Sequence, residues 1–262
     1  MAIGPDLSRY DEWMDWLRAR ADEDPDIRVV WVGGSAATGG YDEWSDLDVD
    51  LLCTSGEHDA TYLRLLDGAL ADFEIDHVWE LPEQTWPDGR QCFINPQHRP
   101  GLLNEPTRII DLHISSLSEE HLQLDVRRHG TPIVVHDPDE LLALRHDDDE
   151  QQIADIADAV EQVRQRRGTG EWLVNRAIAR GHLAEATDFY LRFALGPLVR
   201  LLRVRHCPWR HDYGLRYLDQ DLPADVASRL ATLVPGPDLR GQSSACFAWQ
   251  DELLTDTAGA PS

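Results

Sequence analysis

Two strand-like stretches separated by a glycine turn constrain this chain more than any other feature. Residues 27–32 form a dense β-branched run, which predicts a strand buried on both faces. Gly33-Gly34-Ser35 follows at once, and the stretch 46–51 then alternates acidic and apolar residues. Because side chains in a strand alternate between faces, residues 47–53 are predicted to form a second strand with one apolar and one acidic face.

The same stretch predicts a chemistry. Residues two apart on a strand share a face, so Asp46 and Asp48 aim their carboxylates at one point, where they suit one or two Mg²⁺ ions. Gly33 and Gly34 let backbone N–H groups approach a phosphate closely, and the Ser35 hydroxyl adds a donor. The alternative to a ligand site is that the glycines only form a turn and that the aspartates only line a solvated strand edge. Asp50, on the same face, slightly favours this alternative. Clustered carboxylates repel unless a cation compensates them, so the combination predicts a nucleoside triphosphate site.

The rest of the first half mixes helices and strands. Helical spacing of apolar residues predicts a helix over 7–21, with Asp6 as its cap, and another over 59–71, with Leu63, Leu66 and Leu70 facing inward. Further predicted elements are strands at 73–80, 90–94 and 107–114, a helix at 118–129 and a last strand at 131–135.

The second half has helical spacing almost throughout. An acidic stretch at 147–150 separates it from the first half, and glycines and a proline divide its predicted helices. These helices cover 153–166, 171–180, 183–205 and 225–233. The predicted fold class is α+β, with a catalytic domain at 1–146, a helical bundle domain at 147–254 and a disordered tail at 255–262.

Charge and cysteine content narrow the function classes. The chain has 48 acidic residues against 24 basic ones, no lysine, and a net charge of -24. Nucleic acid is therefore an unfavourable partner, because its phosphates need a row of cations. Four dispersed cysteines suit a reducing compartment. No apolar run reaches the ~20 residues of a membrane span, so a soluble, cytoplasmic protein is expected.

The residues 32–40 (VGGSAATGG) and 45–49 (SDLDV) resemble the signature of the polymerase-beta-type nucleotidyltransferase superfamily. Within it, they are most similar to streptomycin/spectinomycin adenylyltransferases, which share the glycine turn and a helical second domain. The similarity is specific over 27–53, looser up to His136, and only architectural beyond. It implies a nucleotidyltransferase fold, a mixed sheet flanked by helices followed by a helical bundle, and transfer of NMP, with AMP from ATP favoured, to a hydroxyl of a small molecule such as an aminoglycoside-like antibiotic.

The resemblance also implies a third carboxylate on a later strand. Asp111, in an otherwise apolar run, matches best, both as a metal ligand and as the base that accepts the hydroxyl proton. Its structural alternative is a strand-end aspartate paired with Arg108. Glu74, Asp76 and Glu105 are rival bases, and the strands that carry Asp76 and Asp111 are expected to be neighbours. His113, on the Asp111 face, either contacts the substrate or is structural.

The helical half is expected to contribute to acceptor binding, because in the antibiotic-modifying relatives the acceptor binds between the two domains. Acidic and aromatic groups suit an amino sugar, although core packing and solvated faces are the commoner explanation for such residues. The candidates are Glu171, Trp172, Asn175, Asp188 and Tyr190. Arg200, Arg203 and Arg205 either reach the triphosphate or form a solvated helix face. The competing function is a toxin-type nucleotidyltransferase that modifies transfer RNA or a partner protein.

Overall fold

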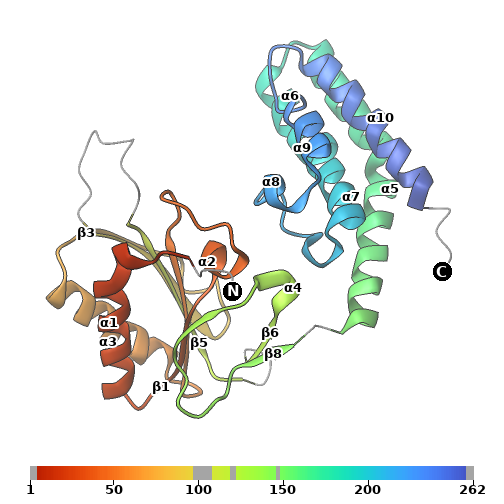
Figure 1. The fold of residues 1–262 in the computed structure, drawn as a ribbon. Helices are drawn as coiled ribbons and strands as arrows, with labels where there is room; N and C mark the ends of the chain where they lie inside the picture. The colour runs from red at the N-terminus through yellow and green to blue at the C-terminus, as the bar shows by residue number, and fades with distance from the viewer. Residues whose placement is uncertain (1–4, 97–107, 119–121, 146–147, 258–262) are drawn as a thin grey trace. The chain divides into compact units, whose positions relative to one another are not determined.

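A computed structural model describes residues 5–96, 108–118, 122–145 and 148–257 of the chain. The chain divides into two compact units, Met1–Asp147 and Asp148–Ser262, which are described separately below. The first combines α-helices with a mixed β-sheet and the second is helical, so the fold class is α+β (Figure 1). In the described part of the chain, no helix has both the length and the apolar character needed to cross a membrane.

The first unit is built on a six-stranded sheet with the strand order β3-β4-β5-β2-β1-β7. Only β2 and β5 pair in parallel, and every other neighbouring pair is antiparallel. The six strands are β1 (Ile27–Val32), β2 (Leu47–Cys53), β3 (Ile75–Glu80), β4 (Gly89–Pro96), β5 (Ile110–Ser116) and β7 (Ile133–His136). A separate short parallel pair consists of β6 (Gln123–Asp125) and β8 (Ala143–Arg145).

Two helices cover one face of the six-stranded sheet, α1 (Asp11–Glu23) and α3 (His58–Asp72) (Figure 1). Their buried side chains share one apolar cluster with the inward residues of β1, β2, β4 and β5. A 3-10 turn (Ser8–Tyr10) precedes α1, and two short helices, α2 (Gly34–Thr38) and α4 (Val126–His129), complete the unit. On the opposite face a smaller cluster of Val29, Trp31 and Leu52 packs against leucines 117, 122, 141 and 142.

Three predictions for this unit need correction. Residues 118–129 were predicted to be helical, but Gln123–Asp125 is a strand and only Val126–His129 is a helix. Leu63 and Leu70 are exposed, because α3 buries the face that carries Tyr62, Leu65, Leu66 and Ala69. The strand that carries Asp76 is not a neighbour of the strand that carries Asp111, since β4 lies between them.

The second unit is helical, as predicted, but its divisions differ. Its main helices are α5 (Asp149–Ala179), α6 (Leu183–Phe189), α7 (Gly196–His206), α9 (Ala224–Ala231) and α10 (Leu239–Thr257). A π-helical turn (Tyr190–Leu195), a 3-10 turn (Pro208–Arg210) and the short α8 (Leu218–Asp221) connect them. Their core includes Val174, Tyr190, Leu198 and Phe247.

Two predicted boundaries in this unit are wrong. The glycines at 168 and 170 do not interrupt α5, which runs through both. Gly170 is buried, and an added Cβ would lie 2.8 Å from Cβ of Phe193, so its role is close helix packing. Helix α10 was not predicted, and it continues through Thr257 into the predicted tail 255–262; residues 258–262 lie outside the described part.

Gln250 explains how α10 holds the π-helical turn. The wider turn frees backbone carbonyls from their usual partners. The buried Gln250 amide donates hydrogen bonds to the carbonyls of Ala194 at 2.7 Å and Phe193 at 3.3 Å. This one polar side chain on α10 therefore gives two carbonyls of the π-helical turn a hydrogen-bond donor and fixes the position of α10 along that turn.

Candidate active site

Two aspartates on neighbouring parallel strands define the candidate site. In the register of β2 and β5, Asp48 pairs with Asp111 and Asp50 pairs with His113. Strands in a sheet lie about 4.8 Å apart, so the Asp48 and Asp111 side chains leave one face side by side. The intervening residues Leu47 and Val49 are buried in the helix-covered core. Period-two alternation therefore places the acidic residues on the face that α1 and α3 leave uncovered.

The glycine turn lies directly against Asp48. Gly34 has φ +53°, and a Cβ built on it would lie 1.8 Å from Asp48 Oδ2, so no other residue fits this backbone and this carboxylate together. The Gly33 N–H donates to the Asp48 carbonyl at 2.9 Å. A Cβ on Gly33 would approach Asp50 Oδ2 at 3.1 Å. The turn is thus built around the acidic face of β2.

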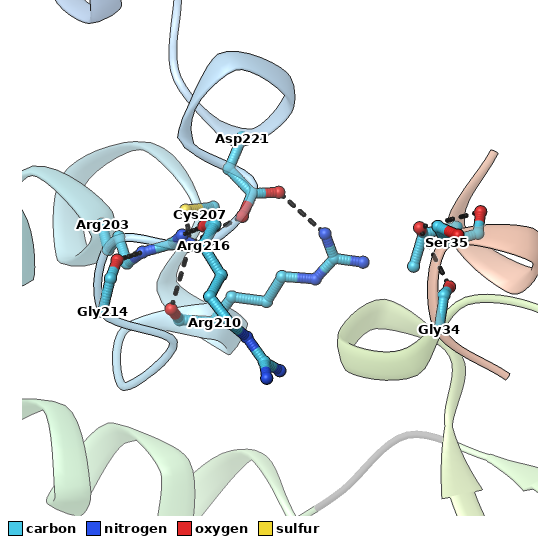
Figure 2. A network of polar contacts seen from close by, with 9 residues as sticks. Gly34, Ser35, Arg203, Cys207, Arg210, Gly214, Arg216 and Asp221 are labelled. Atoms are coloured by element: carbon cyan, nitrogen blue, oxygen red, sulfur yellow. Dashed lines mark hydrogen bonds and ion pairs between the residues drawn. The ribbon is translucent and has the colours of Figure 1, made fainter. Parts of the chain in front are cut away.

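Ser35 is the second residue of the short helix α2 (Figure 2). Its Oγ is buried and has no hydrogen-bond partner among the described residues. A buried polar atom without a partner costs free energy. A ligand oxygen at this turn would remove that cost, and a phosphate is the oxygen-rich group that glycine turns of this kind accommodate.

The segment that leads into β2 is held by the N-terminal 3-10 turn. The Arg9 guanidinium donates to the carbonyls of Asp42, at 3.1 Å, and of Glu43 and Ser45. The Tyr10 hydroxyl donates to the Ser45 carbonyl at 3.3 Å and to the Ile109 carbonyl at 3.4 Å. Together they fix the residues just before Asp46 and just before β5. No local sequence pattern indicates this role, because it depends on a contact between distant segments.

Asp111 lies in an environment that disfavours its negative charge. Burial is the largest cause that raises its pKa, and the charges of Asp46 and Asp50 raise it further. A hydrogen bond from Gln91 Nε2 to Asp111 Oδ1, at 2.7 Å, partly offsets these effects. Gln91 was not among the predicted site residues, and only the β4–β5 register reveals it.

The structure separates the rival acids from this face. Asp76 is exposed on the edge strand β3. Glu74 is exposed just before β3 and lines a cavity of about 190 Å³ together with Arg9 and Arg108. Glu105 lies outside the described residues. Of the candidate bases in the part of the chain that the structure describes, Asp111 is therefore the one that shares a face with Asp48.

His113 contacts protein groups on both sides of its ring. Its Nδ1 lies 3.1 Å from Asp50 Oδ1, and its Nε2 lies 3.2 Å from Ser115 Oγ. The order Asp–His–Ser matches that of a nucleophilic triad, but Ser115 is only 4% exposed. A substrate has no access to its hydroxyl, so these contacts orient Asp50 and His113 within the sheet.

The donor chemistry of this face fits a hard divalent cation. Asp46, Asp48 and Asp111 offer carboxylate oxygens, the ligands that Mg²⁺ prefers. As the side chains stand, the described part of the chain contains no group of three or more His, Cys, Asp or Glu residues arranged to hold a metal ion. What supports a cation is the negative charge of Asp46 and Asp50 near Asp111, which adds to the effect of burial in raising the pKa of Asp111.

The candidates for acceptor binding on the second unit divide into two groups. Tyr190 is fully buried, and its hydroxyl contacts the Leu233 carbonyl and Cys246, so it is a core residue. Trp172 is exposed with the Arg176 guanidinium 4.6 Å from its ring centroid. Glu171 and Asp188 form ion pairs with Arg167 and Arg192 on the same helical segments, and Asn175 is half-buried.

Arg203 is a structural residue and not part of a solvated face (Figure 2). Its side chain is fully buried and pairs with Asp221 at 2.6 Å, which Arg210 also contacts at 2.8 Å. Arg203 Nε donates to the Gly214 carbonyl at 2.8 Å. Arg205 is exposed and Arg200 half-buried on the same helix. The expectation that Arg203 reaches a triphosphate is therefore wrong, because its donors already serve the protein.

Comparison with known proteins adds no family assignment. No protein-family model matches the chain, and no curated protein matches it in sequence.

Proposed function

We propose that the chain is a metal-dependent nucleotidyltransferase with a nucleotidyltransferase fold in its first unit. It would transfer NMP, with AMP from ATP as the favoured case, to a hydroxyl of a small molecule of the aminoglycoside type. The observation that carries this proposal is the pairing of Asp48 with Asp111 across parallel strands, with Gly34 packed against the Asp48 carboxylate. A glycine turn, a hydroxyl without a partner and two adjacent acids on one open face suit a triphosphate and its cation.

Each group has a role in this proposal. The Gly34 backbone N–H and the Ser35 hydroxyl would bind phosphate oxygens, whereas the Gly33 N–H already donates to the Asp48 carbonyl. Asp46, Asp48 and Asp111 would hold one or two Mg²⁺ ions, whose positive charge offsets negative charge on the reacting phosphate. Because burial and neighbouring acids raise the pKa of Asp111, this carboxylate is also suited to accept a proton.

The reaction balances without a further reagent. The acceptor hydroxyl oxygen attacks the α-phosphorus in line, a new P–O bond forms, and the bond to the pyrophosphate oxygen breaks. The hydroxyl proton passes to the Asp111 carboxylate, and pyrophosphate leaves with the electron pair. The residues contribute mainly by holding the two reactants in this alignment, which is where most of the rate enhancement of such enzymes arises.

The test is incubation of the full chain with Mg²⁺, α-labelled ATP and a panel of streptomycin, spectinomycin, kanamycin, lincomycin and transfer RNA. Label on a small molecule, lost in Asp48→Asn, is the expected result. Asp76→Asn is the matched control, because it removes an exposed acid two strands away from β5. Transfer that survives in Asp48→Asn contradicts the site. Label on RNA alone identifies the toxin-type activity instead, which the net charge of -24 disfavours.

A further inference from the structure

A pair of aromatic rings, one exposed and one half-buried, lies in the same row of the sheet as the two acids. Trp79 on β3 pairs with Phe93 on β4, and Phe93 pairs with Asp111 on β5. Asp111 in turn pairs with Asp48 on β2. The row Trp79, Phe93, Asp111, Asp48 therefore crosses four strands at one level of the sheet.

The neighbours of these residues fix the face on which the rings lie. Cys92 and Ile94, which flank Phe93, are buried in the helix-covered core. Val78 packs against the same core, and Glu80 accepts a hydrogen bond from Tyr62 of α3. Trp79 and Phe93 must therefore project from the opposite face. That is the face that carries Asp48 and Asp111.

The two rings stack against each other. Their centroids lie 5.2 Å apart with an interplanar angle of 21°, and Trp79 is 59% exposed. A tryptophan that stacks on one side and leaves its indole open is suited to a ring or a cation. Directly opposite strand positions lie about 5 Å apart, so a ligand on Phe93 reaches the Asp111 carboxylate with an adjacent hydroxyl.

We propose that Trp79 and Phe93 bind the aminoglycoside-type acceptor of the proposed function. This inference rests on the proposed function, since it assigns the second substrate of that site. In-line transfer puts the attacking oxygen opposite the leaving pyrophosphate. With the phosphates at Gly34 and Ser35, beyond Asp48, the attacking side is the side of Asp111 and Phe93. The aromatic pair thus serves the acceptor and not the nucleobase.

The negative charge of this face favours a cationic acceptor. The open face carries the carboxylates of Asp48, Asp50 and Asp111 beside the rings, and the whole chain has a net charge of -24. A ligand with ammonium groups gains both the attraction of these acids and a cation–π contact with Trp79. A neutral sugar gains neither.

Fluorine NMR of the full chain labelled with 5-fluorotryptophan tests this assignment without requiring transfer. Trp79→Phe identifies one of the nine tryptophan resonances. The probes are streptomycin, spectinomycin and kanamycin, with the non-hydrolysable ATP analogue AMPCPP plus Mg²⁺ and sucrose as comparisons. We expect a saturable shift of the Trp79 resonance with at least one amino sugar, and none with AMPCPP or sucrose. Trp44, 51% exposed, reports non-specific effects.

The affinity for that amino sugar should fall about 5- to 30-fold in Trp79→Ala, the range of a cation–π contact, and less in Trp79→Phe. AMPCPP that shifts Trp79 while the amino sugars do not would reassign the rings to the nucleobase. Equal shifts with sucrose contradict a cationic acceptor, and no shift with any probe overturns the site. A Trp79 shift in a protein that transfers no label would show that Trp79 binds the amino sugar and would reject the proposed transfer reaction.

Discussion

At the scale of single residues, Gly34 meets two requirements, a backbone with positive φ and space for the Asp48 carboxylate. Gly34→Ala should destabilise the protein by roughly 2 kcal/mol or more, because it adds a clash with Asp48 to the strain of a positive φ. Gly39→Ala is the matched control, since Gly39 has φ +81° with nothing within 4 Å of an added Cβ. Chemical denaturation measures both. Equal losses in the two variants would show that Asp48 yields to the methyl group.

Ser35→Ala separates ligand binding from stability. The variant should be at least as stable as the parent, because it removes a buried hydroxyl without a partner. Its affinity for MgATP, measured by isothermal titration calorimetry, should fall about 10-fold or more, since hydrogen bonds to charged groups contribute ~1.5–3 kcal/mol. Ser243→Ala is the control, because the Ser243 Oγ on the second unit is also buried and has no partner in the part of the chain that the structure describes. Unchanged affinity in Ser35→Ala would remove Ser35 from the phosphate site.

Asp111 should show a cost in stability that depends on pH. Its folded-state pKa lies above the usual value of 3.8, so the folded state holds its proton more tightly than the unfolded chain does. This contribution favours folding at low pH and turns unfavourable as pH rises through the folded pKa. In metal-free buffer at pH 7, Asp111→Asn should therefore raise Tm by roughly 2–4 °C, the effect of ~1 kcal/mol in a chain of this size.

The rise in Tm caused by Asp111→Asn should disappear as pH falls below 3.8. Added Mg²⁺ should stabilise the parent more than the variant. Differential scanning fluorimetry across pH, with and without Mg²⁺, measures both effects. A variant less stable than the parent at pH 7 would mean that the hydrogen bond from Gln91 outweighs the burial of the charge.

The residues of the site were predictable to different degrees. One short stretch contains Gly34, Ser35, Asp46 and Asp48, and their spacing by itself predicts a phosphate and metal site. In the structure the glycine turn packs on Asp48. The position of Asp111 followed from a resemblance, and the β2–β5 register places it beside Asp48. Contacts such as those of Gln91 and Arg9 join segments far apart in the chain, so no local pattern contains them.

At the scale of elements, α5 offers a matched pair of glycines. Gly168→Ala should stabilise the second unit by about 0.5–1 kcal/mol, because alanine favours helix and nothing lies within 4 Å of the new methyl group. Gly170→Ala should cost about 1–3 kcal/mol, because its methyl group would lie 2.8 Å from Cβ of Phe193. Urea unfolding gives both values. Stabilisation by both would show that the helices separate easily.

The same glycines show why element boundaries were harder to predict than element types. A glycine in a helical pattern indicates a break when only local propensity counts, yet tertiary packing keeps α5 continuous. Strands β1 and β2 were predicted at their observed bounds, because dense β-branching and strict alternation are local signals. The short β6 and β8 are fixed by their mutual pairing, which the sequence does not reveal.

At the scale of the whole molecule, the excess of negative charge should make stability depend on salt. A net charge of -24 repels itself, and the Debye length falls from about 10 Å at 0.1 M to about 3 Å at 1 M. We expect Tm in the presence of a chelator to rise by at least roughly 2 °C between 0.05 and 0.5 M NaCl. A fall in Tm would show that exposed ion pairs such as Arg20–Asp72 outweigh the general repulsion.

The parallel pairing of β2 with β5 also bears on how the protein folds. Asp50 and His113, which pair between β2 and β5, are 63 positions apart in the chain. Closing such a loop costs conformational entropy before the contacts between the two strands can stabilise the pair. Hairpins such as β1–β2 and β3–β4 close shorter loops and can form earlier. We therefore expect Asp48 and Asp111 to meet after these hairpins have formed, so that a nascent chain carries neither their mutual repulsion nor a competent site until β2 and β5 pair.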